Sequence, residues 1–355
     1  MTTLAELTTF RVGGPVADFV EAHTEDEFIA AVREADDAAT PLLVVGGGSN
    51  LLAADAGFSG RVVRDARSGW TVQDDGMCGG VSVTVTAGTP WDDVVAAAIQ
   101  HEWVGLEALS GIPGSVGAAP VQNIGAYGAE LSETLATVRA WDRAEQRVRT
   151  LFSIELGFGY RDSVLKRSLG EYGVTPRWLV LDVTLQMRFG TRSAPVRYEQ
   201  LAQGLGIEVG GTAPTADVRA AVLALRASKG MVLDPADHDT WSAGSFFTNP
   251  VVPDAKVPEG APRFAASGGA PTGHVKTSAA WLIEHAGFGK GFALPGSGAA
   301  LSGKHTLALT NRGTASGDEL RALARHIRDG VWEAFGIELV PEPSILDANG
   351  GLDAL

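Results

Sequence analysis

The 355-residue sequence lacks several features that mark particular classes of protein. Its only cysteine is Cys78, which excludes an internal disulfide and fits a reducing compartment. Cys78 stands at an expected turn-to-strand junction with no histidine nearby, so a catalytic thiol is the less favoured interpretation. No apolar run approaches the 18 residues that a membrane-spanning helix needs. The start, residues 1–10, lacks the basic and apolar regions of a signal peptide, and we expect a cytoplasmic protein.

Positive charge is also in short supply. Twenty-eight lysines and arginines stand against 42 aspartates and glutamates, a formal net charge of −14. This balance argues against a nucleic-acid partner, and an anionic ligand would have to be met by local cations or backbone amides. The seven histidines show no metal-ligand spacing, so no metal is expected. The length suffices for two or three domains.

Glycine, by contrast, is abundant in one almost uncharged run, residues 105–131, with the sequence GLEALSGIPGSVGAAPVQNIGAYGAEL. Glycine allows positive φ angles and lets backbone N–H groups approach a bound surface closely. We interpret the run as a backbone wall that lies against a flat ring system and donates hydrogen bonds to it. A glycine-rich loop between strands is an equally open interpretation from composition alone.

A second glycine cluster follows a buried strand predicted over residues 41–45. The turn Gly46–Leu52, with the sequence GGGSNLL, would expose consecutive N–H groups that can form an anion site for a pyrophosphate. Taken alone this signal is weak. It lacks the G-x-G-x-x-G spacing of a Rossmann dinucleotide site, so no nicotinamide-binding Rossmann fold is predicted here.

Long blocks of the sequence resemble one enzyme family. GIPGSVGAAPVQNIGAYG is similar to the flavin-binding segment of the UDP-N-acetylenolpyruvoylglucosamine reductase (MurB) family. TTFRVGG, VVGGGSNLL, GYRDSVLK, SAGSFFTNPVV, the KTSAAWLIEHAGF segment with its following KG, and ELVPEPSIL match in the same order. The resemblance therefore covers nearly the whole chain.

The resemblance implies an α+β fold with an FAD-binding part of the vanillyl-alcohol-oxidase type and a C-terminal α/β substrate-binding domain. We expect FAD-binding subdomain 1 over 1–70, with 336–355 packing back on it, subdomain 2 over 71–214, and the substrate domain over 215–335. Many members of the flavoprotein superfamily tether the flavin through a histidine near the GGGSN loop. This loop has none, so non-covalent FAD is expected.

Periodicity and turn residues predict individual elements. Thr24 should cap a helix, and Gly336 should end the long helix before it. The stretch 253–273 is expected to be a loop or insertion. Helices are predicted over 25–35, 91–102, 215–229, 278–286 and 317–335; strands over 17–22, 41–45, 81–86, 179–188 and 306–309; and a hairpin over 137–142 and 147–150.

By resemblance, three residues match the catalytic positions of the family. Arg161, in Tyr160–Ser163, matches the catalytic arginine, since a conjugated carboxylate needs a planar cation. A structural Arg161–Asp162 pair is the alternative. Ser245 of Gly-Ser-Phe-Phe matches the general acid, whereas Ser242 does not. Glu342 matches the catalytic glutamate. In many relatives valine and a basic residue follow this glutamate, but here Pro343 and Ser344 do, which puts the fit of the terminal strand in doubt.

Other positions are carried over from the family as ligand contacts. Arg226 and Lys229 are spaced i and i+3, so both could reach one ligand, although a solvated surface pair is the plainer reading of the spacing. The expected cofactor contacts are Gly46, Gly47, Gly48, Ser49, Asn50, Ile112, Pro113, Gly114, Ser115, Gln122, Asn123, Gly125, Ala126, Tyr127 and Arg226, and the expected substrate contacts are Tyr198, Lys229, Asn249 and His305.

The implied reaction is a two-step hydride relay from NADPH to FAD N5 and then to C3 of UDP-N-acetylglucosamine enolpyruvate. Ser245 protonates C2 to give UDP-N-acetylmuramate, a peptidoglycan precursor. Small-molecule partners only and a monomer are expected. Two alternatives remain open: another FAD oxidase or dehydrogenase of this fold acting on an alcohol or hydroxy acid, and a non-catalytic flavin- or nucleotide-binding module.

Overall fold

The computed structural model describes residues 1–74, 79–266, 270–347 and 351–355. The prediction for Cys78 lies outside these residues. The chain forms two compact units: a first of residues 1–17, 48–59 and 229–355, and a second of 18–47 and 60–228. This division is coarser than the three parts expected from sequence, which stay a prediction. Helix α6 (Thr215–Ser228) belongs to the second unit.

The second unit is built on an antiparallel sheet of order β11-β10-β12-β6-β5, with β7 paired to β12. Valines alternate along β6, and the three at 81, 83 and 85 are fully buried against helix α3, as the period-2 pattern predicts. The strands are β5 (Trp70–Asp74), β6 (Val81–Thr86), β7 (Trp103–Val104), β10 (Leu135–Asp142), β11 (Arg147–Phe152) and β12 (Trp178–Phe189), and the helix α3 spans Trp91–Gln100.

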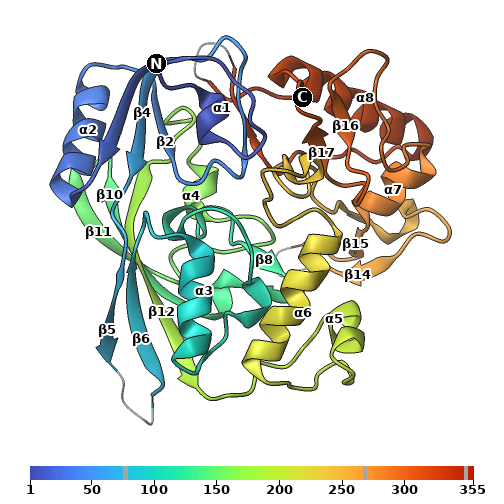
Figure 1. Ribbon diagram of the computed structural model, residues 1–355, viewed down its shortest axis with the longest axis horizontal. Helices are drawn as coiled ribbons and strands as arrows, with labels where there is room; N and C mark the ends of the chain where they lie inside the picture. Colours follow the sequence, from blue (N-terminus) through green and yellow to red (C-terminus); the bar gives the residue numbers. More distant parts are fainter. Residues whose placement is uncertain (75–78, 267–269, 348–350) are drawn as a thin grey trace. The chain divides into compact units, whose positions relative to one another are not determined.

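A smaller sheet of order β1-β4-β2 carries helix α2, which is drawn in blue in Figure 1. Thr24 caps α2 through a capping box with Glu27, confirming the predicted start. Phe28 and Val32 on α2 are buried against this layer and β12. The elements are β1 (Val16–Ala22), α2 (Glu25–Asp37), β2 (Leu42–Val45) and β4 (Phe58–Asp65).

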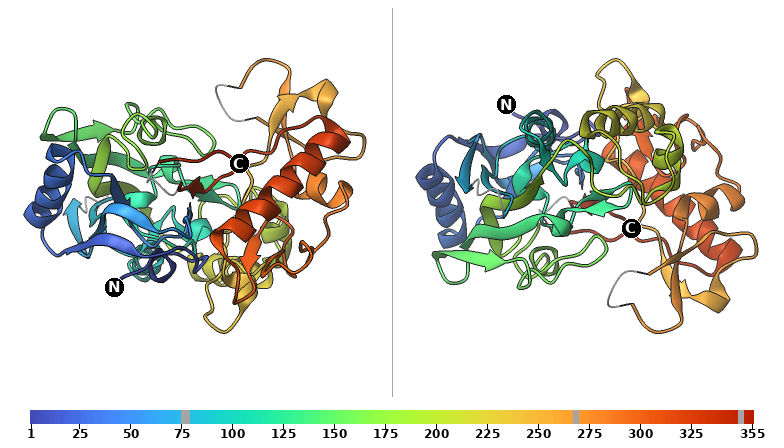
Figure 2. Two further views of the ribbon diagram at one scale, coloured as in Figure 1. Left: turned by 90° about the horizontal axis from the view of Figure 1, so that it is seen from above. Right: turned by 90° about the horizontal axis from the view of Figure 1, so that it is seen from below.

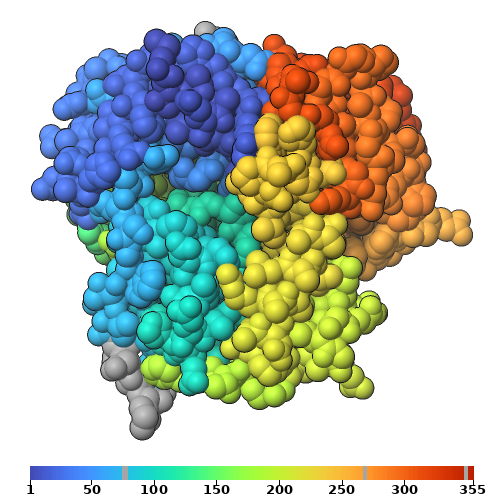
Figure 3. All heavy atoms as spheres, viewed as in Figure 1, coloured from blue at the N-terminus to red at the C-terminus, as the bar shows by residue number. Residues whose placement is uncertain are grey.

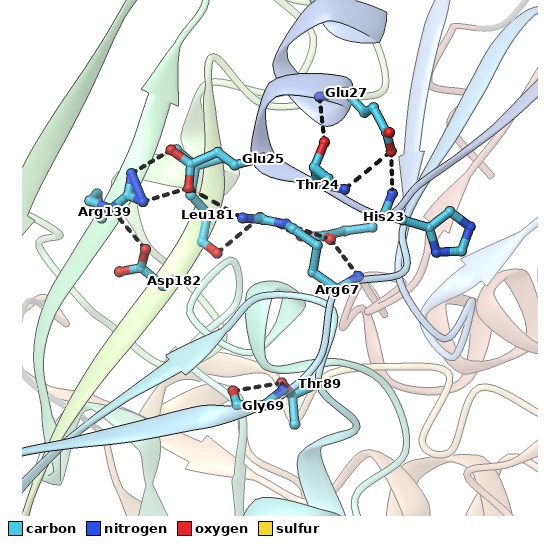
Figure 4. A network of polar contacts seen from close by, with 11 residues as sticks. His23, Thr24, Glu25, Glu27, Arg67, Gly69, Thr89, Arg139, Leu181 and Asp182 are labelled. Atoms are coloured by element: carbon cyan, nitrogen blue, oxygen red, sulfur yellow. Dashed lines mark hydrogen bonds and ion pairs between the residues drawn. The ribbon is translucent and has the colours of Figure 1, made fainter.

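Charged side chains tie α2 to the larger sheet (Figure 4). Arg139 donates to Glu25 at 2.8 Å and to Asp182 at 2.8 Å, and Arg67 bonds to Asp65, to Glu25 and to the carbonyl of Leu181. Burial raises the pKa of Asp182, and the Arg139 guanidinium only partly opposes it. The network fixes how the two sheets of this unit meet.

The remaining elements of the second unit are short, apart from α6. Helix α6 packs beside α3, where the yellow and teal segments meet in Figure 3, and Arg219 on α6 donates two hydrogen bonds to Asp92 on α3, both at 2.7 Å. These elements are β8 (Gly125–Ala126), β9 (Ala129–Glu130), α4 (Val164–Arg167), α5 (Glu199–Gly204) and α6.

The first unit packs around helix α8 (Gly317–Phe335), drawn in red in Figure 2. Its buried residues Leu320, Leu323 and Ile327 face α7 and the phenylalanines at 246 and 247. Gly336 ends α8 in the left-handed conformation with φ 62°, as predicted. The other elements are α1 (Leu4–Leu7), β3 (Leu51–Leu52), β13 (Val251–Pro253), β14 (Arg263–Ala265), β15 (His274–Thr277), α7 (Ala279–His285), β16 (Ala299–Leu301), β17 (Leu309–Asn311) and β18 (Ser344–Ile345).

One expectation for this unit was wrong, and a second, a loop or insertion over 253–273, was incomplete. Residues 306–308 form a turn rather than a strand, because Ala308 N donates to His305 O, and β17 begins only at Leu309. The stretch 253–273 is not simply a loop: it contains β14, which pairs with β15 in the sheet β13-β15-β14. This short exposed strand was not predicted, because proline and glycine near its ends are typical of loops. No helix of the described residues is long and apolar enough to cross a membrane.

Candidate functional site

Arg161 stands at the tip of a two-residue turn in the second unit. Gly159 and Asp162 exchange both backbone hydrogen bonds, at 3.0 and 3.3 Å, and so close the turn. Arg161 has φ 54°, a left-handed conformation that costs an L-residue about 1 kcal/mol. Such strain persists only where the surroundings hold it, and it is concentrated at functional sites.

The Arg161 guanidinium lies on the glycine-rich run. Its Nη2 donates to the carbonyl of Gly125 at 2.6 Å, and its Nη1 to that of Asn123 at 3.5 Å. Asp162 forms its ion pair with Arg167 rather than with Arg161. The structural Arg161–Asp162 pair considered from sequence is therefore wrong, and the cation is aimed at the expected flavin segment.

The glycine-rich run folds back on itself in the hairpin β8–β9. Tyr127 and Gly128 form its tip, with φ 50° and 83°, as two-residue hairpins with type I′ turns require. The Tyr127 ring lies edge-on to that of Tyr198, at the start of α5, with centroids 5.3 Å apart. Burial raises the pKa of Tyr127, while the charge of Arg226 opposes the rise. Three expected contact residues, 127, 198 and 226, thus share one neighbourhood.

Arg226 on α6 is 8% exposed, so the solvated surface pair considered for it is wrong. Its Nε donates to the carbonyl of Gly111 at 3.1 Å, while Gly111 N donates to Asp92, the partner of Arg219. Burial lowers the pKa of Arg226, and Tyr127 and Asp92 oppose this effect. A buried arginine against the glycine-rich run supplies the local positive charge that an anionic ligand needs in an acidic protein.

The two glycine clusters meet within the second unit. A Cβ on Gly46 would lie 2.3 Å from Oγ of Ser115, and a Cβ on Gly47 would lie 2.8 Å from Cα of Gly114. A side chain on Gly47 would force the two backbones apart, and one on Gly46 would displace the Ser115 hydroxyl. The expected pyrophosphate turn and the expected flavin wall, which includes Ile112 and Pro113, therefore abut, as a single dinucleotide-sized ligand would need.

In the first unit, the segments of Ser245 and Glu342 lie side by side and are joined by one isolated bridge, and we call these two segments the strand pair. Glu342 N donates to Phe246 O at 2.8 Å, and Phe247 and Pro341 form an antiparallel bridge. Phe246 and Phe247 are buried and anchor the segment in the core, while Ser245 and Glu342 stay half-buried. Core packing thus holds the hydroxyl and the carboxylate of this pair in neighbouring strands.

Asn50, the last residue of the GGGSN turn, bonds to the segment of Glu342 on both sides of Pro343. Its Nδ2 donates to Glu342 O at 3.3 Å, and its carbonyl accepts from Ser344 N at 3.0 Å. Strand β18 then pairs in parallel with β3, Ser344 opposite Leu51. The Pro343–Ser344 departure therefore leaves the terminal strand formed: Pro343 is buried and its missing N–H breaks no bond of the β18–β3 pair.

His305 lies in a basic neighbourhood of the same unit. Burial lowers its pKa to about 4, and Lys229 and Lys290 add to the effect while Glu284 opposes it. His305 is therefore neutral at pH 7 and can donate or accept a hydrogen bond. Asn249, another expected substrate contact, also has a structural role, because its Oδ1 accepts from Ala279 N at the start of α7.

The expected site residues thus form two groups. Arg161, Tyr198, Arg226 and most flavin contacts belong to the second unit, with Gly46, Gly47, Gln122 and Ala126 among them. Gly48, Ser49, Asn50, Lys229, Ser245, Asn249, His305 and Glu342 belong to the first. Within the described ranges, no group of three or more histidine, cysteine or acidic residues could hold a metal ion.

Sequence reasoning missed Asp92, Arg219 and Lys290. Asp92 and Arg219 fix the backbone of Gly111, but they are 127 positions apart, and nothing in either local pattern links them. Lys290 could have been found, because it stands in the KG pair at the end of a block that resembles the family.

Comparisons with known proteins agree with this geometry. The profile of an FAD binding domain matches residues 16–151, and that of the UDP-N-acetylenolpyruvoylglucosamine reductase C-terminal domain matches residues 234–346. A UDP-N-acetylenolpyruvoylglucosamine reductase of Cutibacterium acnes is 55% identical over 97% of this chain and 89% of its own. The chain belongs to the UDP-N-acetylenolpyruvoylglucosamine reductase family.

Further relatives extend this family assignment. The Mycobacterium avium reductase is 50% identical over 97% of this chain and 94% of its own. The crystal structure of the Thermus caldophilus enzyme has a TM-score of 0.64 and 26% identity, covering 97% of both chains. The expected α+β fold, with an FAD-binding part and a C-terminal domain, is confirmed, and this member of the reductase family is a flavin-dependent oxidoreductase.

The residues present fit FAD. Two side-chain-poor backbone segments abut at Gly47 and Gly114, with a buried arginine against the same run at Gly111, a donor set suited to a diphosphate and a ring system.

Proposed function

We propose that this protein reduces UDP-N-acetylglucosamine enolpyruvate to UDP-N-acetylmuramate with NADPH as the electron donor. The observation that carries the proposal is the Arg161 turn: a strained residue presents a guanidinium on the carbonyls of the expected flavin segment. The closed turn and the carbonyls of the hairpin hold the residue in this strained conformation.

FAD bound here would supply the redox chemistry, the transfer of a hydride from NADPH to C3 of the enol ether. The residues that would hold it are those of the Gly46–Asn50 turn and the 112–127 segment, together with Arg226. Non-reacting parts of the protein contribute placement and electrostatics.

Arg161 binds the carboxylate of the enolpyruvyl group and stabilises the negative charge that gathers there as C3 gains hydride. A guanidinium matches a carboxylate with two parallel donors and stays charged at every working pH. Because its position is fixed before the substrate binds, little reorganisation is needed during the reaction.

Ser245 donates a proton to C2, and Glu342 orients the enolpyruvyl end. A serine hydroxyl is a weak acid, so it can act only toward a strongly basic carbanion or enolate. The backbone pairing of the Ser245 and Glu342 segments supports a joint role, since their side chains are held by one strand pair.

The remaining polar groups suit the nucleotide part of the substrate. Lys229 and neutral His305 lie in one basic neighbourhood, which favours a diphosphate. Tyr198 and Asn249 are the further proposed contacts. NADPH and nucleotide-activated sugars are cytoplasmic metabolites, so we place the enzyme in the cytoplasm, and we infer that it acts as a monomer.

The visible spectrum of the purified protein tests this proposal. NADPH should bleach the flavin bands under anaerobic conditions, and UDP-N-acetylglucosamine enolpyruvate should restore them. Restoration by oxygen with an alcohol as the reductant would instead favour an oxidase of this fold. A colourless preparation that takes up no FAD would overturn the proposal.

A further inference from the structure

Asn123 was expected to contact the cofactor, but its side chain is fully buried and makes three bonds within the protein. Its Nδ2 donates to Glu130 Oε2 at 2.8 Å and to Gly159 O at 3.1 Å, and its Oδ1 accepts from Ser132 N at 3.0 Å. An amide has two donor hydrogens and one carbonyl oxygen, so both ends of this side chain are engaged.

These bonds join the two turns on which Arg161 depends. Gly159 O is at the base of the Arg161 turn, where it also accepts from Asp162 N. Glu130 pairs with Gly125 in the β8–β9 hairpin, and Gly125 O accepts from Arg161 Nη2. The Asn123 side chain therefore links the turn that carries the guanidinium to the hairpin on which it rests.

The backbone of Asn123 has a second part in this arrangement. Its own carbonyl accepts from Arg161 Nη1 at 3.5 Å, and its backbone is left-handed, with φ 48°. Asparagine adopts the left-handed conformation more readily than other residues that carry a side chain. Aspartate could not replace it, because it has no hydrogen to donate to Gly159 O or Glu130.

We propose that Asn123 is a positioning residue for Arg161, which sets the direction of the guanidinium through the two turns rather than by binding the flavin through its side chain. This inference rests on the proposed function of Arg161. A misplacement of a catalytic group by about 1 Å can cost a hundredfold in rate, so a buried residue that touches no substrate can control the reaction.

The test separates the two half-reactions by stopped-flow absorbance of the flavin. The variant Asn123→Gly keeps the left-handed backbone and removes the side-chain bonds. Glu130→Ala removes the bond between Asn123 and Glu130, and it replaces the first variant in the test if Asn123→Gly does not fold. The FAD dissociation constant, the rate of bleaching by NADPH and the rate of recolouring by the enolpyruvyl substrate are measured for each, alone and combined with Arg161→Ala.

A matched control is Asp142→Asn, in the same unit. Asp142 is a buried carboxylate that bonds to Arg177, Trp178 and two backbone N–H groups at the turn of the β10–β11 hairpin. That turn is the opposite end of the hairpin from Phe152, after which the chain leads to Arg161. The control should lower the melting temperature while leaving recolouring at the wild-type rate.

The expected result for Asn123→Gly is recolouring about 10- to 100-fold slower, with the FAD dissociation constant and bleaching rate close to wild type. In the Arg161→Ala background the same substitution should add almost nothing. A weaker FAD affinity with slower bleaching would overturn the inference, since Asn123 would then be a flavin ligand. So would full recolouring activity with a lower melting temperature, or an equal effect in both backgrounds. If Arg161→Ala itself recolours at the wild-type rate, the proposed function of Arg161 fails instead.

Discussion

The Arg161 turn and the Ser245–Glu342 strand pair present reactive groups in opposite ways. Arg161 stands at a tip with a strained backbone, held by carbonyl acceptors and a buried asparagine. Ser245 and Glu342 stand in extended segments that hydrogen-bond to each other and are anchored by buried phenylalanines. The first arrangement fixes one charge closely at the cost of local strain, whereas the second fixes two groups through ordinary core packing.

The largest effect should come from removing the charge of the strained turn. Arg161→Ala should slow flavin reoxidation by the enolpyruvyl substrate about 1000-fold, the cost of losing a preorganised charge at a reacting group. Bleaching by NADPH should change little, because no carboxylate has to be held in that step. Stopped-flow measurement of each half-reaction checks both, and equal slowing of the two would contradict the assigned role.

On the strand pair, Ser245→Ala should slow reoxidation by about 100-fold, a typical contribution of a general acid. Ser242→Ala is the control. Ser242 lies three residues before Ser245, is buried, and accepts a hydrogen bond from Gly244 N through its hydroxyl. The control should lose stability but keep its reoxidation rate. The assignment of Ser245 would be wrong if the two serine variants reoxidised equally fast.

The first unit, which holds the Ser245–Glu342 pair, also contains His305, and its stability should depend on pH through this residue. The pKa of His305 is lowered to about 4 in the folded protein from an ordinary 6.5, so the unfolded state binds its proton first as the pH falls. Stability should therefore decrease between pH 6.5 and pH 4, by no more than about 2 kcal/mol at pH 5 from this group. Above pH 6.5 the protonation of this histidine no longer changes the free energy of unfolding.

His305→Gln should remove that part of the pH dependence. Urea unfolding at pH 7 and pH 5 gives the difference in the free energy of unfolding for both proteins. An unchanged difference in the variant would show that His305 is not held neutral by its surroundings.

The smallest effect tests the backbone strain itself. Arg161 has φ 54°, which glycine adopts more easily than alanine. The free energy of unfolding should therefore be about 1 kcal/mol higher for Arg161→Gly than for Arg161→Ala, although both variants lack the guanidinium. At Ser245, where φ is negative, the order should reverse, and the glycine variant should be about 0.5–1 kcal/mol less stable than the alanine variant. Chemical denaturation of the four variants measures their free energies of unfolding. If glycine and alanine ranked in the same order of stability at both positions, the proposed difference in backbone strain would be wrong.

Much of the fold followed from local patterns. The valines at 81, 83 and 85 predicted a half-buried strand, and Thr24 and Gly336 marked helix ends, because caps and periodicity are local properties. The strand predicted over 306–309 failed where a turn that depends on Ser302 and His305 took precedence. The strand β14 was missed because its pairing with β15 spans a proline- and glycine-rich stretch.

The sequence by itself determined the family, the glycine-rich segments and the three residues proposed for catalysis, because these are carried by contiguous blocks of residues. Only the tertiary structure decided that Asp162 pairs with Arg167, that Arg226 is buried, and that Asn123 braces the Arg161 turn. Those outcomes depend on which residues the fold brings together and on which of them compete for the same hydrogen bonds, because most buried polar groups are hydrogen-bonded. No local pattern carries that information.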